Sequence, residues 1–268
     1  MKKDTLSILI PTHCDNHDRL TIGYSLASLA FQIYPFQQVS IVIRDEGLVP
    51  AIESSSVRLT MTLLAEKGIK VFYHRATKRA GVANARKELY ECVPPETNWV
   101  AFVDDDLLIE PQCFGALYET LMNNADAGFA QGSKIELDAK RTYLNDINKV
   151  NENLDSDPFP IYFGDAALIL FPRAALDLVD WQLVTLFEQE GLAGEDVAMT
   201  LLIADKQPGI GVPRARAWHL SPTVERWHWE TSSDLLQIQI LKNSISKQTM
   251  LEAMPHLSNE IEKLYLKQ

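Results

Sequence analysis

Three consecutive carboxylates, Asp104, Asp105 and Asp106, follow directly after the apolar residues 99–103. Such a run predicts a buried strand, so the three side chains would lie at its carboxyl end, where their like charges repel one another. A cation would offset that repulsion, and carboxylate oxygens are ligands for Mg²⁺ and Mn²⁺. In an extended chain Asp104 and Asp106 point the same way and could hold one such ion against a phosphate. The alternative is an acidic turn or helix start, where carboxylates are also favourable.

A second acidic pair, Glu195 and Asp196, follows Gly194 and comes immediately before the apolar residues 197–204. Taken alone, the pair is typical of the start of a helix, where carboxylates cap free backbone N–H groups. Its functional interpretation is a general base on a loop that faces the first acidic cluster.

His219 ends a short predicted strand, residues 212–218. A lone histidine in such a position is more often packed or exposed than a ligand, but with two carboxylates nearby an imidazole is a natural third ligand for Mn²⁺. His228 stands between Trp227 and Trp229. These rings would stack on a sugar or simply pack in the core, and apolar packing is the default.

Alternating apolar and helix-length segments predict the elements that position these residues. Apolar runs at 6–10, 39–43, 69–73 and 99–103 are separated by helix-length segments at 19–33, 49–67 and 81–92. The spacing of roughly 30 residues is that of a βαβ unit. Nearly continuous apolar runs are typical of a parallel sheet that helices cover on both faces. The sequence therefore predicts an open α/β sheet, and ligands of such sheets bind beyond the carboxyl ends of the strands.

The pattern changes after residue 105. It predicts helices at 111–124, 173–189 and 197–204, strands at 128–136, 166–171 and 212–218, and a polar loop at 138–160. A loop of that length in a compact domain is usually functional or mobile. From residue 233 the chain is amphipathic, with one apolar stripe at Leu235, Ile238, Leu241 and Ile245 and a second at Met250, Met254, Leu257, Ile261 and Leu264. Two helices broken near Pro255, packed on the body or on a partner subunit as a homodimer, explain the stripes. We therefore divide the chain at 1–230 and 231–268.

Composition restricts the class of protein. The 268 residues carry 36 acidic and 25 basic side chains, a formal net charge of −11, which disfavours nucleic acid or an anionic membrane surface as main partner. Three scattered cysteines predict neither a disulfide framework nor a zinc site, and no apolar run approaches a membrane span. We expect a cytoplasmic protein. Phosphate-loop, GxGxxG, HExxH and GxSxG patterns are absent.

Seven short segments, taken in order, resemble the motifs of family 2 glycosyltransferases. They are residues 7–12 (SILIPT), 26–35 (LASLAFQIYP), 41–47 (IVIRDEG), 79–86 (RAGVANAR), the aspartate triplet, 194–196 (GED) and His219. The resemblance covers about residues 5 to 220. It implies a GT-A fold, a Rossmann-like, mostly parallel α/β sheet with flanking helices in a single domain, followed by C-terminal helices. The sequence departs from the family pattern at Glu46, where a second aspartate is usual.

The resemblance also implies roles for individual residues. Pro11 and Thr12 would line a nucleotide pocket, Asp45 would accept a hydrogen bond from uracil, and Arg86 would lie near the nucleotide or its phosphates. Asp104 and Asp105 would bind the nucleotide sugar, while Asp106 and His219 would hold Mn²⁺ or Mg²⁺ on the diphosphate. Asp196 would deprotonate the acceptor hydroxyl, with Glu195 as the alternative base.

The predicted function is therefore metal-dependent, inverting transfer of a sugar, from a UDP-sugar by preference, to a glycan, lipid-linked or protein acceptor. A lipid-linked acceptor would place the protein peripherally at the inner membrane face. Two alternatives stay open. A sugar nucleotidyltransferase would share the sheet and carboxylates, although it usually has a glycine-rich basic loop near its N-terminus. A non-catalytic sugar-nucleotide-binding or assembly subunit is the other.

Overall fold

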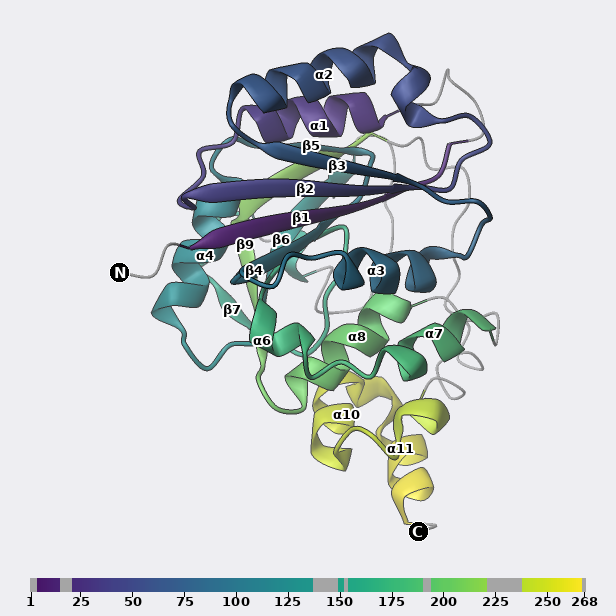
Figure 1. Ribbon diagram of the computed structural model, residues 1–268. Coiled ribbons are helices and arrows are strands. Elements are labelled where there is room, and N and C mark those ends of the chain that lie inside the picture. Colours follow the sequence, from purple (N-terminus) through teal and green to yellow (C-terminus); the bar gives the residue numbers. More distant parts are fainter. Residues whose placement is uncertain are drawn as a thin grey trace.

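Four parallel strands form the first part of a single sheet in the computed structural model (Figure 1). Their bounds are β1 (Thr5–Thr12), β2 (Gln38–Asp45), β3 (Lys70–Arg75) and β4 (Trp99–Val103), in the spatial order β3-β2-β1-β4. The structure describes residues 4–14, 21–136, 149–151, 154–189, 194–220 and 238–266. Strand β1 is central and is hydrogen-bonded to β2 on one side and β4 on the other. The predicted α/β sheet is confirmed, and its chain order reverses between β1 and β4.

The second part of the sheet is mixed. It contains β5 (Leu107–Ile109), β6 (Phe129–Glu136), β7 (Phe159–Ile161), β8 (Leu168–Pro172) and β9 (Gly209–His219). Strand β8 runs antiparallel to β4 and β6, β6 runs parallel to β9, and β5 and β7 run antiparallel to β9. The sequence did not predict β5, because three residues are too few to show a pattern. Most of the predicted loop 138–160 lies outside the described residues, and its last two residues belong to β7.

Helices cover both faces of the sheet. One face packs against η2 (Ala51–Glu53), α1 (Ile22–Ala30), α2 (Ser55–Glu66) and α4 (Cys113–Asn123), and the other against α3 (Val82–Glu91), α6 (Arg173–Leu176), α7 (Trp181–Gln189) and α8 (Glu195–Ala204). Successive side chains of strand β1 point to opposite faces of the sheet. Ile8 and Ile10 are therefore buried in the core beneath α1, α2 and α4, and Leu9 in the core beneath α3, α7 and α8. Continuous apolar runs therefore mark strands that are buried on both sides.

The predicted single helix at 173–189 is wrong, because the structure contains two helices there. Helix α6 ends at Leu176 and α7 begins at Trp181. The Asp180 side chain accepts hydrogen bonds from the backbone N–H groups of Gln182 and Leu183, at 3.0 and 3.2 Å. A carboxylate that satisfies the free N–H groups of a first turn starts a new helix, and this separates α7 from α6.

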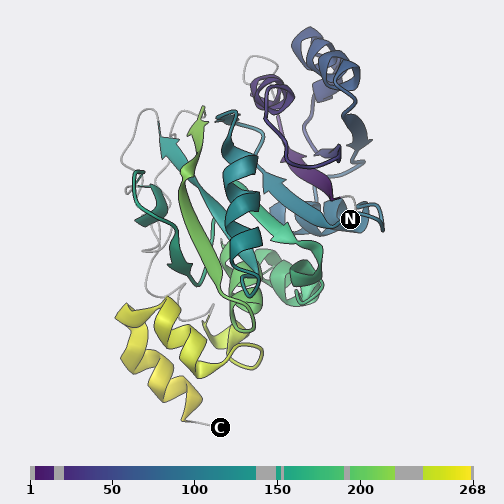
Figure 2. The ribbon, with the colours of Figure 1, turned by 90° about the vertical axis from the view of Figure 1, so that its left-hand side faces the viewer.

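The C-terminal segment comprises α10 (Lys247–Ala253), η3 (Pro255–Leu257) and α11 (Ser258–Tyr265), with the break near Pro255 that the sequence predicts. Figure 2 shows these helices at the end of the molecule opposite α1 and α2. Apolar side chains from both predicted stripes are buried in the core that α7 and α8 share; they are Ile238, Leu241, Ile245, Met250, Met254, Leu257 and Ile261. The stripes therefore pack on the body, and a homodimer through these helices stays a prediction. Leu235 and the boundary at 230 lie outside the described residues.

In the part of the chain that the structure describes, no helix combines the length and the apolar character that crossing a bilayer requires.

Candidate functional site

A cavity of about 210 Å³ lies at the carboxyl ends of β1, β2 and β4, where the strand order reverses. Ligands of open α/β sheets bind at such a reversal. The lining residues are Pro11, Thr12, His13, Glu46, Arg79, Gly81, Val82, Ala85, Asp104 and Asp105. The structure thus brings together four residues predicted to bind the nucleotide sugar, Pro11, Thr12, Asp104 and Asp105.

The three aspartates after β4 contact three different groups. Asp104 pairs with Arg86 at 3.2 Å, Asp105 accepts a hydrogen bond from the Thr12 hydroxyl, and Asp106 lies 2.9 Å from the Nε2 atom of His219. The prediction that Asp104 and Asp106 point the same way in an extended chain is wrong, because the chain turns at 105–106 before β5. Only Asp106 of the three contacts the predicted histidine ligand.

Asp106 and His219 form the candidate metal centre. His219 is buried, with 5% of its surface exposed, and the Asp106 side chain is 15% exposed. Strand pairing places His219 directly opposite Leu107, the residue after Asp106. Among the residues described, no group of three or more histidine, cysteine or acidic side chains has the arrangement of a complete metal site. Two protein ligands fit Mg²⁺ or Mn²⁺, because these ions commonly take their remaining ligands from substrate phosphates and water.

Burial and charge repulsion act on the aspartates. Burial and the neighbouring Asp106 carboxylate raise the pKa of Asp105 to about 7, although the Thr12 hydroxyl opposes this shift. Burial also raises the pKa of Asp104, against the effect of Arg86. Repulsion between the neighbouring carboxylates contributes to both shifts, and a cation bound beside them would offset that part.

Arg86 connects the two acidic clusters. It lies on α3, is only 5% exposed, and pairs with Asp104 of the first cluster and with Glu195 of the second. Burial alone favours the neutral guanidine, but Glu195 and Asp104 together raise the pKa of Arg86 above its ordinary value. Arg86 is therefore a charged residue buried between two carboxylates. It is not among the residues that line the cavity, although its partner Asp104 is, and its place near the nucleotide or its phosphates stays a prediction.

Asp196 lies in the first turn of α8, after Gly194. Gly194 has a φ of +98°, which side chains rarely adopt, so a glycine here lets the chain turn into the helix. The Asp196 carboxylate accepts a hydrogen bond from the Val197 N–H at 2.8 Å. Burial raises the pKa of Asp196 to about 8, and the Glu195 and Asp165 carboxylates act in the same direction. Since Glu195 already pairs with Arg86, Asp196 is the better candidate base of the two.

The Asp45 carboxylate has four donors within the protein. The backbone N–H groups of Gly47 and Ala51 donate to it at 2.8 and 2.7 Å, the Tyr73 hydroxyl at 2.5 Å and Arg75 at 2.8 Å. A carboxylate has about four acceptor positions, so these donors fill it. With 1% of its surface exposed, Asp45 acts here as a loop anchor. The predicted uracil contact stays a prediction and competes with these donors.

A buried ion pair between Lys134 and Asp165 lies near Asp104 and Asp196, and the sequence did not predict it. Their side chains are 7% and 10% exposed. Although burial opposes it, Lys134 holds the pKa of Asp165 below its usual range. Asp165 also accepts a hydrogen bond from the Ala167 N–H at 2.9 Å, and the Ala167 carbonyl accepts one from the Asp104 N–H at 3.0 Å. The pair thus supports the position of Asp104. The only sequence signal was a lysine within the predicted strand 128–136. The predicted aromatic cluster around His228 lies outside the described residues.

Comparisons with known proteins agree with this geometry. The family model for glycosyl transferase family 2 matches residues 7–177, more than half of the chain. No curated protein matches the chain.

Among solved structures, residues 1–349 of S. aureus TarS match with a TM-score of 0.60 at 12% identity, covering 98% of this chain and 87% of that one. The same TarS piece in complex with UDP-GlcNAc matches with a TM-score of 0.56 at 12% identity, covering 97% of this chain and 71% of that one. The mannosyltransferase PcManGT from Pyrobaculum calidifontis, in complex with GDP-Man and Mn²⁺, matches with a TM-score of 0.56 at 15% identity. The match covers 97% of this chain and 69% of that one. At these identities the structural matches establish the fold.

Proposed function

The chain belongs to glycosyl transferase family 2, and from this membership we propose that it transfers a sugar from a nucleoside diphosphate sugar to an acceptor hydroxyl in a metal-dependent, inverting reaction. The observation that carries the proposal is that Arg86 joins the two acidic clusters, the first of which contributes Asp104 and Asp105 to the cavity lining. UDP is the favoured nucleotide. A TarS structure contains UDP-GlcNAc and the mannosyltransferase structure contains GDP-Man and Mn²⁺, so both nucleotides belong in the test.

The charge of the cavity supports metal dependence. Its lining contains three carboxylates, Glu46, Asp104 and Asp105, and one arginine, Arg79. Glu46 and Asp104 already pair with Arg44 and Arg86, so these two arginines are engaged by the protein's own carboxylates. A nucleoside diphosphate is itself an anion, and an added cation would stabilise it beside these carboxylates. Asp106 and His219 would hold Mn²⁺ or Mg²⁺ at its edge. When bound, the ion supplies charge stabilisation for the departing diphosphate.

The chain's own residues divide the remaining work. Asp196 takes the proton from the acceptor hydroxyl as its oxygen attacks the sugar, a contribution of typically ~10²–10⁴-fold. Glu195 pairs with Arg86 and holds the start of α8 against α3. Attack from the face opposite the diphosphate inverts the anomeric centre. A product with retained configuration would contradict this part of the proposal.

The direct test is release of UDP or GDP from UDP-GlcNAc and GDP-Man, with Mn²⁺, Mg²⁺ or EDTA. We expect metal-dependent release from one nucleotide class. Nucleotide binding without release under any condition would favour a non-catalytic binding subunit, and formation of a sugar nucleotide from a nucleoside triphosphate would favour a nucleotidyltransferase. A cytoplasmic location stays a prediction.

The raised pKa of Asp196 predicts a pH dependence. Because a general base acts in its ionised form, transfer is expected to rise as the pH increases through about 8, the pKa of Asp196, and to fall below it. The measurement is the initial rate of nucleotide release between about pH 6 and 9. Nucleotide binding measured over the same range separates this effect from titration of Asp105. A rate that is constant or falls with pH would contradict the assignment of Asp196.

A further inference from the structure

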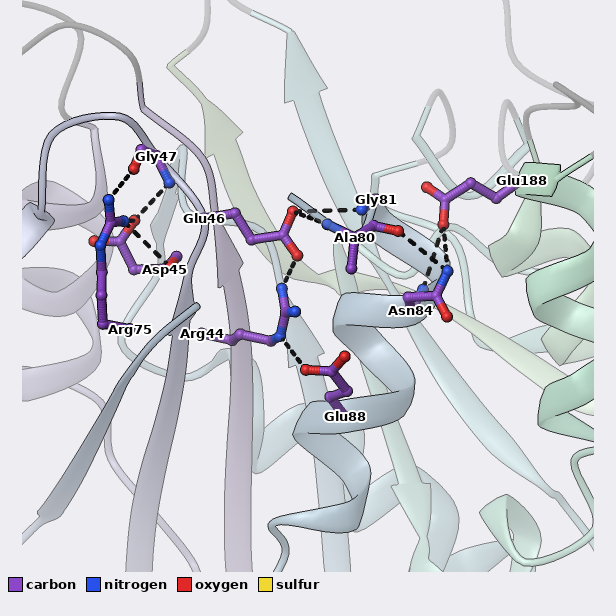
Figure 3. A network of polar contacts seen from close by, with 10 residues as sticks. All are labelled: Arg44, Asp45, Glu46, Gly47, Arg75, Ala80, Gly81, Asn84, Glu88 and Glu188. Carbon is purple, nitrogen blue, oxygen red and sulfur yellow. Dashed lines mark hydrogen bonds and ion pairs between the residues drawn. The ribbon is translucent and has the colours of Figure 1, made fainter. Parts of the chain in front are cut away.

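Two carboxylates from different elements hold the beginning of α3 (Figure 3). Glu46, which follows β2, accepts hydrogen bonds from the N–H groups of Ala80 and Gly81 at 3.2 and 3.4 Å. Glu188, near the end of α7, accepts hydrogen bonds from the side chain and the backbone N–H of Asn84 at 3.1 and 3.5 Å. In Figure 3 the two carboxylates approach residues 80–84 from opposite sides. The free N–H groups of a helix start attract carboxylates, so both contacts are favourable.

The two contacts serve different parts of the molecule. Glu46 lines the cavity, is 5% exposed and pairs with Arg44, which also pairs with Glu88 of α3 at 2.8 Å. Glu188 does not line the cavity, because it comes from the α7 side of α3. Glu46 therefore fixes the wall of the cavity, whereas Glu188 fixes α7 to the helix that forms this wall.

Gly81 makes room for Glu188. Its φ is +85°, a conformation that side chains rarely adopt, and an added Cβ at this position would collide with the Glu188 carboxylate. The carboxylate thus occupies the space that a side chain would fill. This close fit distinguishes the contact from a chance pairing of surface side chains.

Helix α3 contacts the chain on both sides of the connection between α7 and α8. Asn84 binds Glu188, one residue before α7 ends at Gln189, and Arg86 binds Glu195, the first residue of α8. The two contact residues on α3 are only two positions apart. Both ends of the connection are therefore attached to one turn of α3, and Asp196 follows directly after the second attachment.

We propose that Glu188 is a positioning residue, which fixes the end of α7 to α3 and thereby places Asp196, at the start of α8 that shares a core with α7, for proton abstraction. This inference rests on the proposed function, because it assigns Asp196 the role of the base. Glu188 packs against Gly81, a lining residue, but is not itself among the residues that line the cavity. Small displacements of a catalytic group lower rates strongly, so loss of this attachment would affect the chemical step more than nucleotide binding.

The test uses the full chain and four variants: Glu188→Ala, Asn84→Asp, the double variant Asn84→Asp with Glu188→Gln, and Gln189→Ala as the control. Asn84→Asp places two carboxylates in contact. An aspartate in the first turn of α3 is itself favourable for the helix, but Asn84→Asp also removes the hydrogen bond that the Asn84 side chain donates to the Ala80 carbonyl at 3.1 Å. The double variant shares this second loss, so its difference from Asn84→Asp reports the contact with position 188. In the double variant the hydrogen bond is restored with donor and acceptor exchanged. Gln189 is an exposed neighbour on the same helix.

Hydrogen exchange of the first turn of α8 is the primary measurement. We expect about tenfold faster exchange there in Glu188→Ala and Asn84→Asp, as for loss of a hydrogen bond to a charged group, and wild-type exchange in the double variant and the control. Exchange of β4 should not change. Unchanged exchange of α8 in Glu188→Ala, or a double variant that is worse than both single variants, would overturn the proposal.

Activity provides the second measurement. UDP release from UDP-GlcNAc, or GDP release from GDP-Man if that is the donor, should fall roughly 10- to 100-fold in Glu188→Ala, with the Kd of the nucleotide in Mn²⁺ unchanged. The double variant should recover the rate. A loss confined to nucleotide affinity would also overturn the positioning role. If the wild type released no nucleotide, the proposed function would fail, while the exchange result would still decide whether Glu188 attaches α8 to α3.

Discussion

Replacing Asp196 by asparagine is expected to leave Mn²⁺-dependent nucleotide binding at its wild-type Kd and to lower sugar transfer by about 10²- to 10⁴-fold. Asparagine has nearly the same shape and can still accept the Val197 N–H, so the start of α8 is preserved. It cannot take a proton from the acceptor hydroxyl. The rate of nucleotide release and a nucleotide titration on the same protein sample check both halves of this expectation.

Glu195→Gln is the matched comparison for that variant. Glu195 pairs with Arg86, so its replacement should weaken the attachment of α8 and destabilise the protein, with a smaller direct effect on proton transfer. If Glu195→Gln abolished transfer in a stably folded protein while Asp196→Asn kept the wild-type rate, Glu195 would be the base.

Replacing Arg86 by methionine is expected to lower the free energy of unfolding by about 3–5 kcal/mol. Arg86 is 5% exposed, and its removal leaves the Asp104 and Glu195 carboxylates, whose side chains are 31% and 13% exposed, without their shared cation. Methionine retains most of the side-chain volume, so the loss reports the charge and its hydrogen bonds. Denaturant unfolding, followed by circular dichroism, measures the change.

Arg214→Met is the control for this variant. Arg214 also pairs with a glutamate, Glu119, but the two side chains are 52% and 63% exposed. Exposed pairs contribute typically less than about 1 kcal/mol. Adding Glu195→Gln to Arg86→Met should recover part of the lost stability, because one uncompensated charge is removed. Equal effects of Arg86→Met and Arg214→Met would contradict the central role of Arg86.

The parallel half of the fold could be predicted from the sequence because its strands are buried on both faces. A strand such as β1 then appears as an unbroken apolar run between helix-length segments. Three residues of β5 carry no such pattern. The break between α6 and α7 depends on Asp180 as a helix cap, and an aspartate before an apolar helix is a signal that the sequence does contain.

The site was predictable in its residue types but not in its pairings. Motifs identified the carboxylates and His219. Their common location followed from the sheet, because the carboxyl ends of parallel strands meet at one edge. The ion pair between Arg86 and Glu195 joins residues 109 positions apart, and the hydrogen bond between Asn84 and Glu188 joins residues 104 apart. Such partners are set by how helices pack on the sheet, and a single sequence does not contain that information.

For Asp45 the sequence predicts the position of the residue but not its hydrogen-bond partners. The motif places an acidic residue after β2, and the structure confirms that place. Its four donors, however, come from the following loop and from β3, so its carboxylate is already satisfied within the protein. Glu46, the departure from the family pattern, is the acidic residue of this turn that faces the cavity.

The most direct test of the account is a calorimetric titration of the wild type and of Asp106→Ala with UDP and GDP, with and without Mn²⁺. The account predicts micromolar binding of one nucleotide, about −8 kcal/mol, which requires Mn²⁺ and is lost in Asp106→Ala. Nucleotide binding of equal strength without metal, or unchanged binding in Asp106→Ala, would contradict the assigned metal centre. No binding of either nucleotide under any condition would contradict the proposed function itself.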